Sequence, residues 1–316
     1  MYYPNLRVKA GEVKALKHAP SGWQNQICPI WNLESSASFE KAISDVKEVW
    51  PDKSIIDMSR FQLREVSPSA QNFIAKENLS FAIDPLSISD LHSSVLPSFK
   101  TNPIFRIEIK ESLSTFRSGK LNAVRSALAA FAFKDNTLLL FDFVEATEEL
   151  IADNNDIVLL LTEFFKLGFP KIVFSTGAFP TTLQDVLGAE ELPRLDKRLF
   201  ESVKNKLAFE ISYGDYGTLS PLWDATQTLR SGHIAIRYTL DDDWLVLRQK
   251  GKDTASIIEL AELLTMHPSY KGRAFSWADE NWMNKTLVPP LAGPGNSTGH
   301  VAEFMNHHFA QVLSGG

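Results

Sequence analysis

The chain has 316 residues, of which 44% are hydrophobic and 22% are charged, as in globular proteins with a large core. Its 38 acidic and 32 basic residues give a formal net charge of −6. Because the two signs are interspersed along the chain, the composition gives no support to nucleic-acid binding.

A single cysteine, Cys28, excludes an intrachain disulfide and is typical of a reducing compartment. The N-terminus lacks the basic and apolar layout of a signal peptide. Every apolar run is far shorter than the roughly 20 residues that a membrane span needs. We therefore predict a soluble, cytoplasmic protein without membrane attachment.

Short apolar runs of strand type alternate with segments of helical period over the first two thirds of the chain. We expect strands at residues 6–9, 27–31, 54–58, 81–84, 103–109, 137–143, 171–175 and 208–213. Between them we expect helices at residues 38–50, 121–133, 156–168 and 195–206. This alternation favours parallel pairing through right-handed crossovers. It predicts an α/β fold, a (β/α)8 TIM-like barrel, with an open doubly wound sheet as the alternative.

The pattern changes after Asp215. Residues 233–239 and 244–248 flank Leu240-Asp241-Asp242-Asp243 and predict an antiparallel β-hairpin. Helices are expected at residues 254–266 and 298–313. We therefore expect a barrel over residues 1–217 and a C-terminal elaboration of hairpin and helices over residues 218–316, packed on the barrel.

Functional side chains of a parallel barrel gather at the carboxyl-terminal ends of its strands. The polar residues at or just beyond the predicted ends are Asn32, Asp57, Arg60, Arg106, Glu108, Asp142, Ser175, Asp215 and Tyr216. Carboxylates grouped with an arginine suit general acid–base chemistry or a divalent metal. The other interpretation is that they are solvated strand ends or ion pairs inside the barrel, and both interpretations stay open.

Two local motifs stand out. In Tyr213-Gly214-Asp215-Tyr216-Gly217, two glycines bracket an Asp-Tyr pair, which indicates either a backbone path that presents Asp215 and Tyr216 or a packed turn. His307 and His308 are adjacent, so on a helix they point about 100° apart and are poorly placed to share a metal. No zinc-type spacing, nucleophile elbow, kinase signature or P-loop is present, so the sequence identifies no metal and no cofactor.

Several landmarks resemble the Beta-protein family of phages and bacteria. In chain order they are Tyr3 to Glu12 with Ala15-Leu16, Ile27-Cys28-Pro29-Ile30, Ser175 to Pro180, Gly214-Asp215-Tyr216-Gly217, Ile236-Arg237-Tyr238-Thr239 with Trp244-Leu245-Val246, and His307-His308. The resemblance implies a barrel-like fold and an association with phages and mobile elements, including conflict between phage and host. It implies no particular activity, cofactor or catalytic residue. It indicates that the Asp215-Tyr216 turn, Arg237-Tyr238 and the His307-His308 helix share one functional surface.

Two hypotheses of function follow. The first is a component of phage–host conflict, in defence or counter-defence, that recognises a protein partner or a small anionic ligand at the barrel mouth. The second is a metal-assisted hydrolase or phosphodiesterase that uses the carboxylates of Asp57, Glu108, Asp142 and Asp215. The lack of a complete catalytic signature favours the first.

For a ligand site at the barrel mouth, the predicted residues are Arg106, Glu108, Asp142, Asp215, Tyr216, Arg237, His307 and His308. Arginine suits a carboxylate or phosphate because its planar fork binds two oxygens at once. The alternative for Arg237 is a structural salt bridge with Asp215.

Overall fold

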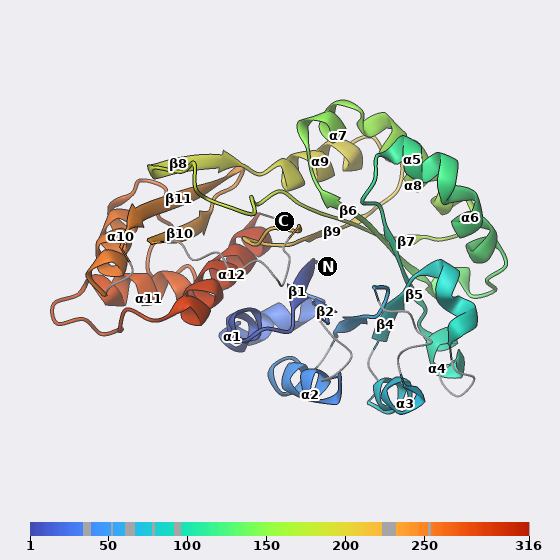
Figure 1. Cartoon of the computed structure of the whole chain (residues 1–316), viewed down its shortest axis with the longest axis horizontal. Coiled ribbons are helices and arrows are strands. Elements are labelled where there is room, and N and C mark those ends of the chain that lie inside the picture. The colour runs from blue at the N-terminus through green and yellow to red at the C-terminus, as the bar shows by residue number, and fades with distance from the viewer. Residues whose placement is uncertain are drawn as a thin grey trace. The chain divides into compact units, whose positions relative to one another are not determined.

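The computed structural model describes residues 1–33, 39–51, 53–60, 67–77, 80–91, 96–222, 232–251 and 254–315, and the chain forms two compact units (Figure 1). The first unit comprises Met1–Val8, Gln24–Ala178 and Leu195–Tyr216. The second comprises Lys9–Trp23, Phe179–Arg194 and Gly217–Gly316. Residue 217 thus begins the last segment of the second unit, to which two earlier segments also belong.

The first unit is a closed barrel of eight parallel strands (Figure 1). Each strand pairs with the next, and the last pairs with the first to complete the ring. The strands are β1 (Tyr3–Arg7), β2 (Ile30–Asn32), β3 (Ile55–Asp57), β4 (Ser80–Ile83), β5 (Ile104–Glu108), β6 (Leu138–Glu145), β7 (Lys171–Gly177) and β9 (Ser212–Asp215). This confirms the predicted TIM-like barrel over the open sheet.

Helices surround the ring of strands (Figure 1). They are α2 (Phe39–Val49), α3 (Pro68–Lys76), α4 (Leu96–Thr101), α5 (Leu113–Gly119), α6 (Leu121–Ala129), α7 (Glu148–Ala152), α8 (Asn154–Lys166) and α9 (Leu195–Lys204). In α8, the buried residues Ile157, Leu160, Leu161 and Phe164 recur at the spacing of one helical face. Ser38, the expected start of the helix before Trp50, lies outside the described residues.

The first and last barrel strands are among those that differ from the expected ranges. The first begins at Tyr3 instead of residue 6, and the last runs from Ser212 to Asp215 instead of residues 208–213. The last strand contains Gly214, and glycine has a low propensity for strands. A Cβ atom at Gly214 would lie 2.7 Å from the carbonyl oxygen of Tyr3, so the glycine permits the close approach of β9 to β1.

The second unit contains the predicted hairpin, made by β10 (His233–Thr239) and β11 (Asp243–Lys250) in antiparallel pairing. A third strand, β8 (Gly188–Pro193), pairs with β11 and was not predicted, because its Gly-Ala-Glu-Glu-Leu-Pro sequence lacks apolar alternation. The helices are α1 (Ala10–Lys17), α10 (Thr254–Met266), α11 (Trp277–Thr286) and α12 (Ser297–Ser314).

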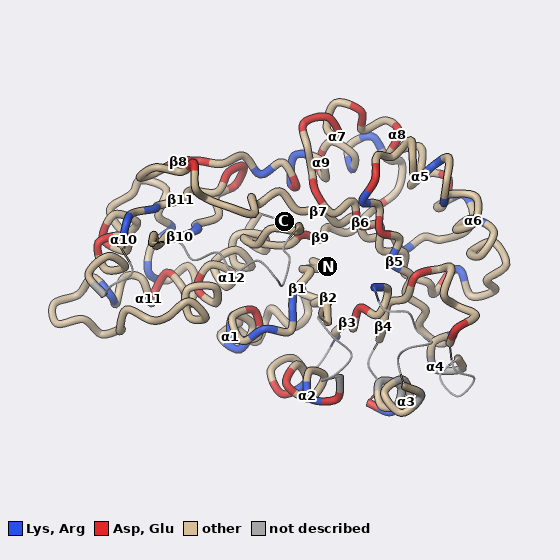
Figure 2. The backbone as a smooth tube through the Cα atoms, viewed as in Figure 1, with Lys and Arg blue, Asp and Glu red and all other residues tan. Residues whose placement is uncertain are grey.

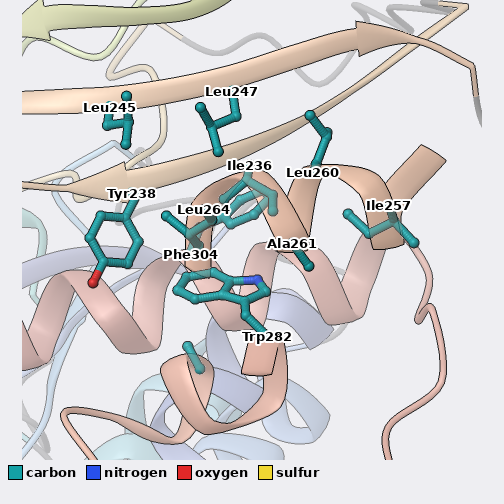
Figure 3. Packing of buried hydrophobic residues seen from close by; sticks show 11 residues of the cluster. Ile236, Tyr238, Leu245, Leu247, Ile257, Leu260, Ala261, Leu264, Trp282 and Phe304 are labelled. Carbon is teal, nitrogen blue, oxygen red and sulfur yellow. The ribbon is translucent and has the colours of Figure 1, made fainter. Parts of the chain in front are cut away.

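An apolar cluster joins the hairpin to these helices (Figure 3). Trp282 of α11 is fully buried and packs with Ile236 and Tyr238 of β10, Leu260 of α10 and Phe304 of α12. The second unit therefore has a hydrophobic core of its own, separate from the interior of the barrel.

Charge is spread along both units. Figure 2 shows Lys and Arg interspersed with Asp and Glu along the chain, as the composition indicated. Within the described ranges, no helix is both long enough and apolar enough to cross a lipid bilayer.

Candidate functional site

The interior of the barrel changes from apolar to polar along the strand direction. Its apolar part includes Cys28, Ile30, Ile55, Ala82, Ile104, Leu140 and Val173. Because side chains alternate between the two faces of a strand, the residue two positions further on points to the same interior. In five strands, and directly after β4, that residue is polar, and we call this set the polar level: Asn32, Asp57, Asp84, Arg106, Asp142 and Ser175. It lies at the carboxyl-terminal end of the barrel, where such folds place their functional sites.

Arg106 of β5 lies at the centre of the polar level, with 0% of its side chain exposed. Its Nη1 donates to Asn32 Oδ1 at 2.7 Å and to Asp57 Oδ2. Its Nη2 donates to Asp142 Oδ2 and to the hydroxyl of Tyr216 at 3.0 Å. We call these five residues the Arg106 network. They come from four strands and the residue after β9, so the intact barrel is needed to assemble them.

The backbone fixes the acidic residues of the polar level. Asp57 Oδ1 accepts a hydrogen bond from the amide of Ser59 at 3.0 Å, and Asp142 Oδ1 accepts one from the amide of Val144 at 3.0 Å. Asp84 Oδ1 accepts from the amide of Leu86 at 2.7 Å. At three strand ends, therefore, an aspartate binds the amide two residues ahead, which orients its carboxylate relative to its own strand.

Val144 adopts a strained backbone conformation beside this site. Its φ angle is 58°, in the left-handed region that β-branched residues rarely occupy, and its side chain is buried. The pairing register between β6 and β7 shifts between Asp142 and Glu145, so the strain coincides with a bulge. Residues held in such conformations occur preferentially at functional sites.

A second charged group borders the Arg106 network, and we call it the rim: Arg60, Glu108 and Lys110. Arg60 Nε and Nη2 both lie 2.9 Å from Glu108 Oε2, and Lys110 Nζ lies 2.9 Å from Glu108 Oε1. Arg106 Nη2 lies 3.6 Å from Glu108 Oε2 and connects the two groups. The side chains of Arg60 and Lys110 are 37% and 61% exposed, so the rim reaches solvent whereas Arg106 does not.

The surroundings hold these groups in fixed charge states. Burial opposes the charge of Arg106, but the carboxylates of Asp57 and Asp142 outweigh burial and raise its pKa well above the usual value. Burial would raise the pKa of Glu108, but the cations of Arg106, Arg60 and Lys110 outweigh it and lower that pKa. Burial and the Asp142 charge both raise the pKa of Tyr216, so its hydroxyl stays protonated.

Asn5 of β1 and Ser175 of β7 extend the polar interior. Asn5 Nδ2 donates to Ser175 Oγ at 2.5 Å, and Asn5 Oδ1 is buried without a hydrogen-bond partner. Asn5 was missed from the sequence because the first strand was expected to begin after it. Tyr3, Asn5 and Arg7 lie two residues apart and therefore share one face of β1. This spacing identifies Asn5 as inward-facing once the strand is correctly placed. Lys110 of the rim was also missed, and its position directly after the strand expected at residues 103–109 is the signal that could have found it.

The predicted site residues divide into two groups. Arg106, Glu108, Asp142 and Tyr216 come together as described above. Asp215 is the last residue of β9 and accepts a hydrogen bond from the hydroxyl of Tyr2 at 2.5 Å. Since Gly214 pairs in register with the inward-facing Ser175, alternation directs Asp215 to the other face of the sheet.

The remaining predicted residues belong to the second unit. Arg237 of β10 donates to the carbonyl of Thr218 at 2.6 Å, and its guanidinium lies 4.6 Å from the centre of the Phe179 ring. His308 Nδ1 lies 3.0 Å from the hydroxyl of Thr239. These contacts position the side chains within their own unit.

His307 is fully buried between two acceptors. Its Nδ1 lies 2.8 Å from Asp279 Oδ2, and its Nε2 lies 2.9 Å from the carbonyl oxygen of Thr239. The ring also stacks on Tyr238, with centroids 3.7 Å apart. In the described part of the chain, no three His, Cys, Asp or Glu side chains are placed to hold one metal ion.

Solved structures similar to the chain include a GH18 chitinase from Pseudoalteromonas aurantia, with a TM-score of 0.41 and 12% identity over 69% of this chain and 94% of the chitinase. They also include the arginine decarboxylase of Paramecium bursaria Chlorella virus, with a TM-score of 0.40 and 12% identity over 67% of this chain. The match spans 57% of the decarboxylase. A comparison with curated proteins finds no match.

The family comparison agrees with the sequence landmarks and confirms the resemblance drawn from them. The model of the Beta protein family matches residues 2–314, nearly the whole chain. The chain therefore belongs to the Beta protein family.

Proposed function

We propose that the chain is a recognition protein whose barrel binds a small ligand with an anionic group at the carboxyl-terminal ends of its strands. The observation that carries the proposal is the polar level, where five strands and the residue after β4 place polar side chains at the same position, and Arg106 binds two of the carboxylates. One level below, the interior is filled by apolar residues. Buried ion pairs are often no more stabilising than apolar packing, so a role in binding accounts for them better than stability does.

The Arg106 network is organised in advance of any ligand. Arg106 has four hydrogen-bonded partners, and the backbone amides of Ser59 and Val144 orient two of these partners. A ligand that meets fixed polar atoms loses less entropy in ordering them, which favours affinity and specificity. The strained Val144 beside Asp142 fits this interpretation, because functional sites are where proteins retain such strain.

The fixed charge states favour recognition over the hydrolase hypothesis. General acid–base catalysis needs a group whose pKa lies near neutrality. The pKa of Glu108 is lowered and those of Arg106 and Tyr216 are raised, so each moves further from neutrality. In addition, the guanidinium of Arg106 binds both Asp57 and Asp142, at the place between the carboxylates that a divalent cation would need.

We place this recognition in conflict between phage and host, as a component of defence or counter-defence. The resemblance of the sequence landmarks to phage and bacterial proteins supports that setting.

Native mass spectrometry of the purified protein tests the proposal. We expect a small molecule to copurify with the wild-type chain and to be lost from Tyr216→Phe, which alters one hydroxyl of the Arg106 network. The matched control is Glu163→Gln, which alters an ion pair with Arg125 on the outer helices. A folded Tyr216→Phe protein that retains the molecule as the control does would place the binding elsewhere. A copurifying divalent metal with hydrolytic activity would favour the second hypothesis instead.

A further inference from the structure

Glu108 is surrounded by three cationic side chains. It contacts Arg60, Lys110 and Arg106, at the distances given above. The charge of Arg106 is already matched by the carboxylates of Asp57 and Asp142. Asp57 and Asp142 together carry one negative charge more than Arg106 balances, and the rim carries one positive charge more than Glu108 balances. The two groups together are therefore neutral, and an anion that enters the rim has to take the place of Glu108.

The rim has the geometry of an oxyanion site. Two nitrogens of the Arg60 fork converge on one oxygen of Glu108, while Lys110 binds the other oxygen. Arginine forks and lysine ammonium groups are the usual partners of carboxylates and phosphates. The bound carboxylate is 20% exposed, and it belongs to a flexible side chain at the end of β5. It can therefore leave without disrupting the strand.

We infer that Glu108 holds the place of the ligand's anionic group. An oxyanion, either a carboxylate or a phosphate, binds Arg60 and Lys110 by displacing the Glu108 side chain into solvent. This inference rests on the proposed function and adds the identity of the groups that bind the anion. Glu108 then acts as an internal competitor that lowers the affinity for anions, so that only a ligand with further contacts to the barrel displaces it.

The sign of one mutational effect separates this role from its opposite. If Glu108 competes with the ligand, removing its carboxylate strengthens anion binding. If Glu108 instead binds a cationic group of the ligand, the same change weakens ligand binding. Titration with free anions tests the first role, and retention of the copurifying ligand by Glu108→Ala tests the second.

Titration calorimetry of the full chain with inorganic phosphate and, separately, acetate measures this sign at low ionic strength. We expect Glu108→Ala to bind one of the two anions about tenfold more tightly than the wild type, and Glu108→Gln to show a smaller gain. The anion with the larger gain identifies the ligand group as phosphate or carboxylate. Adding Arg60→Ala to Glu108→Ala is expected to abolish the gain. Glu163→Ala, which frees Arg125 on the outer helices, is expected to show none.

Unchanged or weaker binding of both anions by Glu108→Ala overturns the inference, provided that its melting temperature shows a folded protein. Glu108→Gln gives the same test if the alanine variant does not fold. Failure here is distinguishable from failure of the proposed function. A copurifying ligand retained by the wild type and lost from Tyr216→Phe would leave the recognition site in place while excluding the role of Glu108.

Discussion

The hydroxyl of Tyr216 lies 2.6 Å from Oδ2 of Asp142, which is 74 positions earlier in the chain. It donates to that carboxylate and accepts from Arg106 Nη2 at 3.0 Å. One buried hydroxyl therefore hydrogen-bonds to both an acid and a base, and it links the residue after the last barrel strand to β5 and β6.

Tyr216→Phe removes this link while keeping the ring. We expect it to lower the free energy of unfolding by about 1–3 kcal/mol, because Asp142 loses a donor and Arg106 loses an acceptor in a buried site. Urea unfolding followed by circular dichroism measures the change. An unchanged urea midpoint would show that water replaces the hydroxyl with no loss of unfolding free energy.

Arg106→Met tests the buried ion pairs directly. It leaves the carboxylates of Asp57 and Asp142 without their cation, and we expect a loss of about 3–5 kcal/mol in unfolding free energy. Arg106→Lys is expected to recover only part of this unfolding free energy, since an ammonium group cannot reproduce the two guanidinium nitrogens that bind the two carboxylates. Arg125→Met, which alters a partly exposed pair with Glu163, is expected to lose less than about 1 kcal/mol. Equal losses in the two methionine variants would contradict this interpretation.

The stability of the chain should depend on the ionisation of Glu108. Its pKa in the folded state lies below the ordinary value of 4.5, so the folded chain binds this proton less readily than the unfolded chain. The resulting stabilisation is fully present above that ordinary value and is lost as the pH falls through the lower, folded-state pKa. We expect Glu108→Gln to show a shallower decrease of unfolding free energy on acidification below pH 4.5 than the wild type. Urea unfolding at a series of pH values measures this dependence. If the unfolding free energies of the two proteins fall equally with pH, Glu108 contributes nothing to the pH dependence.

Gly214→Ala tests the closure of the barrel. The added Cβ would lie 2.7 Å from the Tyr3 carbonyl oxygen, which belongs to the backbone and cannot rotate away. We expect a loss of about 1–3 kcal/mol, as for other overpacked positions. Gly119→Ala is the matched control, because it lies at the end of α5 with no atom within 4 Å of the new Cβ. It is expected to raise the unfolding free energy by about 0.5–1 kcal/mol. Similar losses of unfolding free energy in both variants would show that the contact with the Tyr3 carbonyl is not the cause of the loss.

Periodicity predicted the alternation of strands and helices but left an open sheet as an alternative, and the pairing of β1 with β9 shows that the barrel is closed. The internal strands carry buried apolar runs, as in Leu138–Glu145, and four of the expected runs are followed by an expected helix, as at Asn154–Lys166. The first and last strands were misplaced because a contact between β1 and β9, more than 200 residues apart in sequence, determines their bounds. Strand β8 was missed for a similar reason, since its pairing with β11 and not its own composition makes it a strand.

The candidate site was predictable in part. Strand ends in a parallel barrel converge, and that rule alone brought Arg106, Glu108, Asp142 and Tyr216 into one group. The face on which a residue lies depends on register, which a single sequence leaves open. Asp215 was grouped with the others although alternation directs it away from Ser175, and Asn5 was left out.

The second unit draws on three separate stretches of the chain, Lys9–Trp23, Phe179–Arg194 and Gly217–Gly316. On the ribosome, α1 therefore emerges long before α12, the helix against which it packs. Strand β1 likewise waits for β9 before the ring can close. A chain shortened after residue 217 retains every barrel strand but leaves α1 and β8 without α12 and β11. The boundary that looks natural in the sequence is thus a poor place to cut, because the second unit cannot finish folding until the residues after the last barrel strand have been synthesised.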